Sequence, residues 1–105
     1  MSEEQLGDLK QLTENLLNLQ RAPSQFTIFC HLLATGKSMT VKEISSELEL
    51  TPKATERAVA KLLGKGLIQR NKFREGTYTC DSRRILISVL VTTTELHQDY
   101  ESRRK

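Results

Sequence analysis

The stretch LTPKATERAVAKLLGKGLIQR, residues Leu50–Arg70, decides the fold predicted for this chain. Thr51 is a good helix N-cap, and Pro52 suits the first helical position, where the missing N–H has no helical partner to lose. Apolar side chains then recur at helical spacing, at Ala58, Val59, Leu62 and Leu63. Gly66 can adopt the left-handed conformation that often follows a helix. The stretch therefore predicts a helix over 51–64, a tight stop and then an extended segment.

The segments on both sides of this helix indicate how it is used. Upstream, Thr40 and Glu43 are spaced as a capping box for a short helix over 41–48. Downstream, residues 67–73 and 77–80 read as two strands of a β-hairpin, here called the wing (67–80). A short helix, a turn, a basic helix and a hairpin, in this order, predict a winged helix-turn-helix.

The rest of the chain adds helices to this unit. They are predicted over residues 3–20, 25–35 and 82–102. The expected fold is mainly α with a small β-hairpin wing. A chain of 105 residues has the size of one domain. Within this 1–105 domain, a winged-helix core over 24–80 is flanked by terminal helical segments, 1–20 and 82–105.

Charge is distributed unevenly along the chain. The net charge is only +3, but residues 1–20 hold four acidic side chains and one Lys, whereas residues 51–76 hold seven basic and two acidic side chains. A basic segment that coincides with a helix-turn-helix is typical of a nucleic-acid-binding protein. A solvated charged surface is the alternative interpretation.

The segment from Val41 to Tyr78, with EISSELELTPKATERAVAKLLGKGLIQR at its centre, resembles the winged-helix transcriptional regulators of the MarR and TrmB groups, including their small single-domain archaeal relatives. The order of the predicted elements extends this resemblance over nearly the whole chain. It implies that the helix beginning at Thr51 enters the major groove and that the wing meets the minor groove or the DNA backbone. It also implies that the terminal helices form a homodimer.

We therefore expect the chain to be a sequence-specific regulator that binds double-stranded DNA as a homodimer. Side chains on the first turns of the reading helix would contact base edges, and those further along the helix and on the wing would contact phosphates. The candidate DNA-binding residues are Thr51, Lys53, Thr55, Glu56, Arg57, Lys61, Arg70, Lys72 and Arg74. Lys37 and Lys42 are further candidates for contacts to the backbone.

Two of these residues have alternative interpretations. Arg57 suits a bidentate contact to guanine, but it could instead form an ion pair with Glu47 or Glu49. Glu56 stands where members of these families often carry a small hydroxyl residue. It would either read a cytosine amino group or pair with a neighbouring lysine, Lys53 or Lys61.

The terminal helices carry more apolar surface than one small domain needs. In the first helix the leucines follow the 3–4–3 spacing of a packing seam, and the last helix has two apolar stripes. The candidate dimerisation residues are Leu9, Leu12, Leu16, Leu19, Leu86, Val89, Leu90, Leu96 and Tyr100. Packing within one subunit is the alternative role for the leucines of the first helix.

Cys30 and Cys80 are too few and too far apart in sequence for a metal site of their own. Two unpaired thiols in a reducing compartment are the default expectation, and a Cys30–Cys80 disulfide and a thiol redox switch are the alternatives.

No catalytic constellation stands out in the sequence. It has no Gly-rich phosphate loop, no nucleophile–His motif and no metal-ligand cluster, so we expect no enzyme activity, no cofactor and no bound metal. No window is apolar enough to cross a membrane and no signal peptide is evident, which indicates a cytoplasmic protein. The rival functions are a winged-helix module that binds another protein and an architectural protein that binds DNA without sequence specificity.

Overall fold

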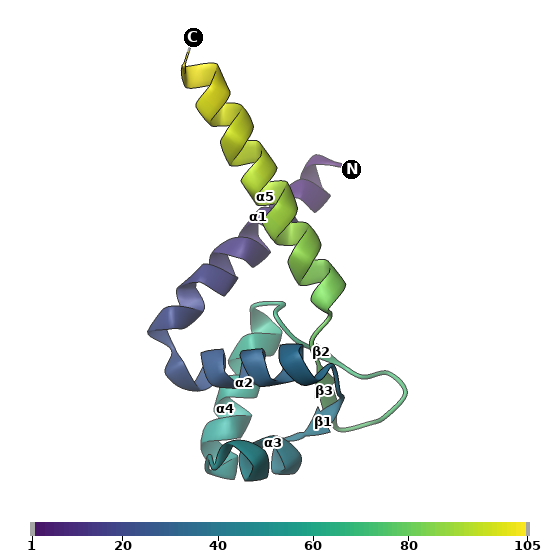
Figure 1. Ribbon diagram of the computed structural model, residues 1–105. Helices are drawn as coiled ribbons and strands as arrows, with labels where there is room; N and C mark the ends of the chain where they lie inside the picture. The colour runs from purple at the N-terminus through teal and green to yellow at the C-terminus, as the bar shows by residue number, and fades with distance from the viewer. Residues whose placement is uncertain (1, 105) are drawn as a thin grey trace.

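A computed structural model describes residues 2–104 of the chain. Figure 1 shows a winged-helix body from which two long terminal helices project. The elements in chain order are α1 (Glu3–Leu17), the 3₁₀ helix η1 (Asn18–Arg21), α2 (Pro23–Thr35), β1 (Met39–Thr40), α3 (Val41–Leu48), α4 (Pro52–Gly64), β2 (Gln69–Arg70), β3 (Thr77–Thr79) and α5 (Ser82–Arg103). The fold is thus mainly helical with a small antiparallel sheet, and the predicted fold class is confirmed.

Local capping explains where most of these helices begin. Ser2 and Gln5 form a capping box at α1, and Thr40 and Glu43 form a second one at α3. The Asp81 side chain accepts hydrogen bonds from the first backbone amides of α5. Each cap satisfies N–H groups that have no partner inside the helix, so these starts are encoded by neighbouring residues.

The sheet has the strand order β1-β3-β2, and both pairings are antiparallel. Met39 of β1 lies opposite Tyr78 of β3, and Arg70 of β2 lies opposite the other side of Tyr78. The central strand β3 therefore joins the short strand before α3 to the strand that follows α4. This arrangement places the wing loop beside the start of α3 (Figure 1).

A single apolar core lies beneath the helix-turn-helix. Phe29 and Leu32 of α2, Ile44 of α3 and Leu62 of α4 are almost fully buried in it. Leu67 follows α4 and closes the core from the sheet side. Because these residues come from α2, α3 and α4, the orientation of α4 is determined by packing as well as by its own sequence.

The terminal helices α1 and α5 cross and contact each other (Figure 1). The Thr92 hydroxyl donates a hydrogen bond to the Thr13 hydroxyl at 3.1 Å, and Lys10 forms an ion pair with Glu95. The far half of α5 extends beyond α1, and both termini lie at the end of the molecule away from α3 (Figure 1).

Three predicted boundaries need correction. The helix predicted over 3–20 ends at Leu17 and continues as the 3₁₀ turn η1. The helix predicted to start at residue 25 already starts at Pro23, because proline is tolerated in the first turn. The wing strand predicted over 67–73 is only Gln69–Arg70, since the Asn71 side chain accepts a hydrogen bond from the Phe73 amide and turns the chain into a loop.

Candidate nucleic-acid interface

The reading helix α4 begins as the sequence predicts. The Thr51 hydroxyl accepts a hydrogen bond from the Ala54 amide at 3.2 Å, and Pro52 occupies the first helical position. The core side of α4 is formed by Ala58, Val59 and Leu62, which are buried. The opposite side of the helix is therefore free to face a ligand.

Four charged side chains occupy this free side and are exposed, namely Lys53, Glu56, Arg57 and Lys61. Within residues 2–104, none of the four takes part in an ion pair. The ion pair considered for Arg57 is not formed, and Glu47 instead lies 3.5 Å from His31 Nε2. Neither lysine considered as a partner for Glu56 is paired with it. Three cations on α4 thus remain available for phosphates or base edges.

Thr55 does not belong to this set, which corrects the sequence-based assignment. Its side chain is fully buried, and its hydroxyl donates a hydrogen bond to the Thr51 carbonyl at 3.0 Å. Position 55 lies four residues after Thr51, on the side of the helix that turns into the core. A side chain in this position cannot reach a base edge, so Thr55 supports the helix rather than reading DNA.

Arg57 and Lys61 also border a shallow open pocket between α4 and the first turn of α2. Ser24 and Gln25 line its other side. Because α2 has no side-chain N-cap, the backbone N–H groups of its first turn are not satisfied by a capping residue. The positive side chains of Arg57 and Lys61 and the N-terminus of α2 thus face the same pocket.

The three basic residues assigned to the wing have different environments. Arg70 and Lys72 are exposed and, within the described residues, unpaired. Arg74 instead reaches back to the body, where its guanidinium donates a hydrogen bond to the Ser38 carbonyl at 3.1 Å and lies 3.3 Å from a Glu43 carboxyl oxygen. Arg74 therefore attaches the wing to the body of the protein, and its positive charge is paired with Glu43.

The pKa of Glu43 is lowered from its ordinary value, which is consistent with this role. The main cause is the hydrogen bond from the Thr40 backbone amide, followed by that from the Thr40 hydroxyl, and the nearby Arg74 charge adds to the effect. The carboxylate that caps α3 is thus also the carboxylate that holds the wing.

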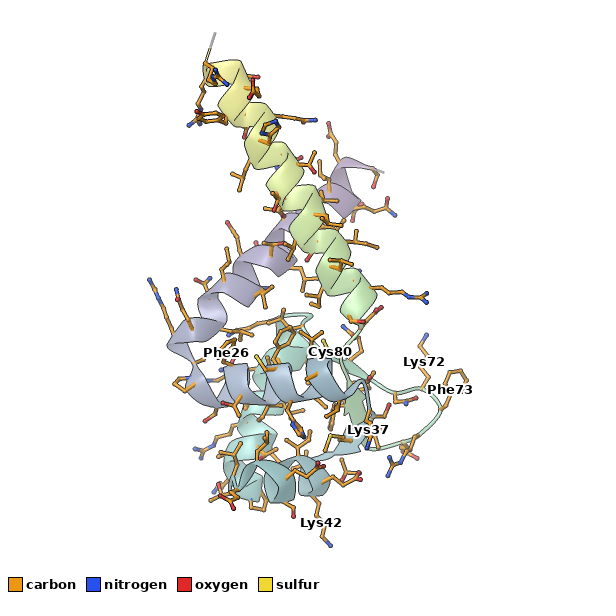
Figure 2. All side chains as sticks on the ribbon, viewed as in Figure 1. Phe26, Lys37, Lys42, Lys72, Phe73 and Cys80 are labelled. Carbon is orange, nitrogen blue, oxygen red and sulfur yellow. The ribbon has the colours of Figure 1, made fainter. Side chains whose placement is uncertain are left out.

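Sequence reasoning missed several features of this surface. Lys65 was counted with the basic segment, but its ammonium donates a hydrogen bond to the Gln25 side chain at 2.7 Å. Phe73 was placed on a strand, but it is 98% exposed at the end of the wing loop (Figure 2). Asn71, a residue that favours Asx turns, lies inside the apparent strand and could have revealed the loop. Lys42 on α3 points away from the body in Figure 2, in keeping with its expected role.

The candidate dimerisation residues divide into two groups. Leu9, Leu12 and Leu19 are buried in the chain's own core, and Leu16 and Val89 are half-buried. The exposed members lie on α5 and are 56–64% exposed, namely Leu86, Leu90, Leu96 and Tyr100. Packing inside the subunit thus accounts for the leucine seam of α1, and α5 offers the free apolar surface.

Both cysteines are free thiols. Cys30 is exposed on α2, whereas Cys80 is buried where β3 leads into α5. Burial, together with the Asp81 charge and the proximity of Cys30, raises the pKa of Cys80 to about 11. A thiol with a raised pKa is a poor nucleophile at neutral pH.

Among residues 2–104, no group of three or more His, Cys, Asp or Glu side chains is placed to hold a metal ion. No helix in this range combines the length and the apolar character that a bilayer crossing requires.

Comparison with known proteins agrees with the fold. The model of the MarR family matches residues 22–73, which extend from the end of η1 into the wing loop. No curated protein matches the sequence. Among solved structures, the oxidised form of MarR from E. coli has a TM-score of 0.53 and 20% identity, covering 94% of this chain and 79% of that one. An apo form of a mutant of Lactococcus lactis ZitR has a TM-score of 0.51 and 21% identity, covering 99% and 80%.

Proposed function

With the chain identified as a MarR-type winged-helix transcription regulator, we propose that it binds specific sequences in double-stranded DNA and does so as a homodimer. The observation that carries the proposal is the set of unpaired cations on the exposed side of α4, Lys53, Arg57 and Lys61. Cations without protein partners are free to neutralise phosphates and to release the counterions bound there.

In this proposal α4 lies in the major groove. An α-helix with its side chains is about 10–12 Å across, and the major groove is about 12 Å wide, so the helix fits. Thr51, Lys53, Glu56 and Arg57 lie on its first turns, where base edges are reached. Arg57 would form a bidentate contact with guanine, and Glu56 would accept a hydrogen bond from a cytosine amino group.

The remaining cations serve the DNA backbone. Lys61 lies one turn beyond Arg57 and borders the pocket at the start of α2, where a phosphate oxygen would also meet the backbone amides. Arg70 and Lys72 on the wing would contact the neighbouring minor groove or its phosphates. Contacts of this kind orient the protein on the duplex, whereas the base contacts of α4 carry the sequence preference.

The homodimer would be formed through α5. Exposed apolar residues along one helix are unusual in a soluble monomer unless they have a partner, and here Leu86, Leu90 and Tyr100 share this surface. A two-fold dimer would present two reading helices about 34 Å apart to a palindromic site. The cytoplasmic location expected from the sequence stays a prediction.

Fluorescence anisotropy tests the proposal directly. A labelled duplex from the region upstream of the protein's own gene is titrated at several salt concentrations, with a scrambled duplex in parallel. We expect tighter binding to the first duplex and a steep decrease in affinity with salt. Equal affinity for both duplexes would indicate an architectural DNA-binding protein. No binding at low salt would contradict the proposal and favour the protein-interaction module.

A matched pair of variants locates the interface. Arg57→Gln removes one positive charge from α4 and should decrease the affinity for the specific duplex about tenfold or more, because a bidentate base contact contributes ~1–3 kcal/mol. Arg103→Gln removes the same charge from the exposed end of α5 and should leave the affinity almost unchanged. Equal effects of the two substitutions would indicate that only the overall charge matters.

A further inference from the structure

Phe73 is the most exposed large apolar side chain of the described residues, at 98% exposure. It lies at the far end of the loop between β2 and β3, and Figure 2 shows it beside Lys72, directed away from the body of the protein. An aromatic ring in this position contributes nothing to the core. Its exposure to water would be relieved by an apolar surface on a ligand.

The loop that carries Phe73 is held at both ends. On the entering side, the Asn71 backbone amide donates to the Thr77 carbonyl at 3.0 Å, and the Asn71 side chain accepts a hydrogen bond from the Phe73 amide at 2.8 Å. On the leaving side, the Thr77 hydroxyl donates to the Arg74 carbonyl at 2.6 Å. The aromatic ring thus projects from a turn whose backbone is restrained by hydrogen bonds.

The loop is also fastened to the body. The side-chain amide of Asn71 donates a hydrogen bond to the Ser38 hydroxyl. The Arg74 guanidinium donates one to the Ser38 carbonyl and lies against the Glu43 carboxylate. Ser38 precedes β1, and Glu43 belongs to α3, so the wing is tied to the element that supports the reading helix. A restrained wing loses little conformational entropy when it binds.

The charges around the ring favour a polyanion. Lys72 is adjacent to Phe73 and has no ion-pair partner among residues 2–104, and Arg70 is exposed at the base of the wing. Arg74 is largely compensated by Glu43, and the exposed Glu75 lines the same small pocket as Arg70. Among the described residues, the unpaired positive charge next to the ring is therefore that of Lys72, with Arg70 further back at the base of the wing. An exposed aromatic ring with positive charge beside it matches the minor groove of a duplex, where apolar base surfaces lie between two rows of phosphates.

We propose that Phe73 is an apolar wedge, which inserts from the minor groove between two base pairs and kinks the bound duplex, while Lys72 holds the adjacent phosphate. This inference rests on the DNA binding proposed above and adds a mode of recognition to it. Inserted side chains read how easily a base step is unstacked, so Phe73 would favour flexible pyrimidine–purine steps beneath the wing.

DNA bending measured by energy transfer tests the wedge. A duplex from the protein's own upstream region, with a donor at one end and an acceptor at the other, is titrated with wild-type protein and with Phe73→Ala and Phe73→Leu. We expect wild-type protein to raise the transfer efficiency and Phe73→Ala to abolish most of this rise. Phe73→Leu should preserve much of it, because leucine also acts as a wedge.

Salt dependence separates the wedge from charge effects. Phe73→Ala should weaken binding about tenfold without changing the slope of log affinity against log salt, since it removes no charge. Lys72→Gln should decrease that slope and keep the bend. Because Phe73 is outside the core, Phe73→Ala should unfold at the same temperature as wild type.

The outcomes are distinct. If wild-type protein binds the duplex and Phe73→Ala binds and bends it equally well, the wedge is wrong and the proposed function stands. If wild-type protein binds without bending the duplex, the wedge is again wrong. If wild-type protein does not bind the duplex at low salt, both the wedge and the proposed function are contradicted.

Discussion

The side-chain amide of Asn15 in α1 donates a hydrogen bond to the main-chain carbonyl of Lys65, at 3.0 Å. Lys65 is the C-cap of α4, so this bond joins a terminal helix to the end of the reading helix. A carbonyl at a helix C-terminus has no partner inside its own helix, and Asn15 satisfies this one. Through this contact the terminal helices help to determine the orientation of α4.

We expect Asn15→Ala to decrease the free energy of unfolding by about 1 kcal/mol, because it removes one partly buried hydrogen bond. The unfolding temperature would decrease by about 4–8 °C for a domain of this size. Thermal unfolding followed by circular dichroism measures this change. Asn18→Ala is the matched control, since Asn18 is exposed and should tolerate the substitution. Equal unfolding temperatures for both variants would contradict the role of Asn15.

Thr55→Val should leave DNA affinity unchanged within about twofold, because the side chain is buried and its hydroxyl bonds within the helix. The substitution keeps the shape of the side chain and leaves the Thr51 carbonyl with its helical partner, the Thr55 amide. Anisotropy titrations with the specific duplex measure the affinity. A decrease in affinity as large as that expected for Arg57→Gln would indicate that Thr55 contacts a base after all.

Leu90→Glu should convert the dimer into a monomer, because it introduces a charge into the exposed apolar side of α5. Light scattering measures the mass, which should decrease from twice 12.0 kDa to 12.0 kDa. Gln98→Glu adds the same charge on another side of α5 and should leave the dimer intact. A monomeric wild-type protein at micromolar concentration would rule out the proposed homodimer.

Alkylation with iodoacetamide at pH 8 should distinguish the two thiols. Cys30 is exposed and should react readily, whereas Cys80 is buried and its pKa is raised to about 11, so little thiolate is present. Peptide mass spectrometry of the native and the denatured protein identifies the modified residue. Rapid modification of Cys80 in the native protein would contradict its burial, and protection of both thiols until a reductant is added would indicate a disulfide.

The raised pKa of Cys80 also predicts a loss of stability at high pH. The ordinary pKa of a cysteine thiol is 9.0, and the pKa of Cys80 in the folded protein is about 11. Between these values the unfolded chain releases the proton while the folded chain keeps it, so stability is fully present below pH 9 and decreases as the pH approaches 11. Chemical denaturation of wild type and Cys80→Ala should show a steeper decrease for wild type. Parallel decreases would exclude a contribution from Cys80.

The sequence was sufficient for the starts of α1, α3, α4 and α5 and for the order of these helices and the wing. The caps at Thr40, Thr51 and Asp81 depend on side chains that bond to amides two or three residues further on. Such contacts are local, and their signals lie within a single turn of the sequence. The apolar spacing of α4 and the charge asymmetry were also evident, and they led to the reading helix and its cations.

The roles of individual side chains depended on contacts between distant segments. Lys65 bonds to Gln25 forty residues away, and Arg74 reaches Ser38 and Glu43. No local pattern distinguishes these cations from Lys53 or Lys72, which remain free. The extent of the wing strand was decided by a turn at Asn71, whose side chain accepts a hydrogen bond from the Phe73 amide and donates one to the distant Ser38 hydroxyl.

The sequence by itself thus determined a winged helix-turn-helix with a basic reading helix, because caps and apolar periodicity act over short distances. Only the tertiary structure decided which residues are available for binding. It buried Thr55, Leu9 and Leu12, engaged Arg74 and Lys65 in contacts within the chain, and left Phe73 and the apolar side of α5 exposed. The reason is that the availability of a side chain depends on what packs against it, and this is a property of the whole fold.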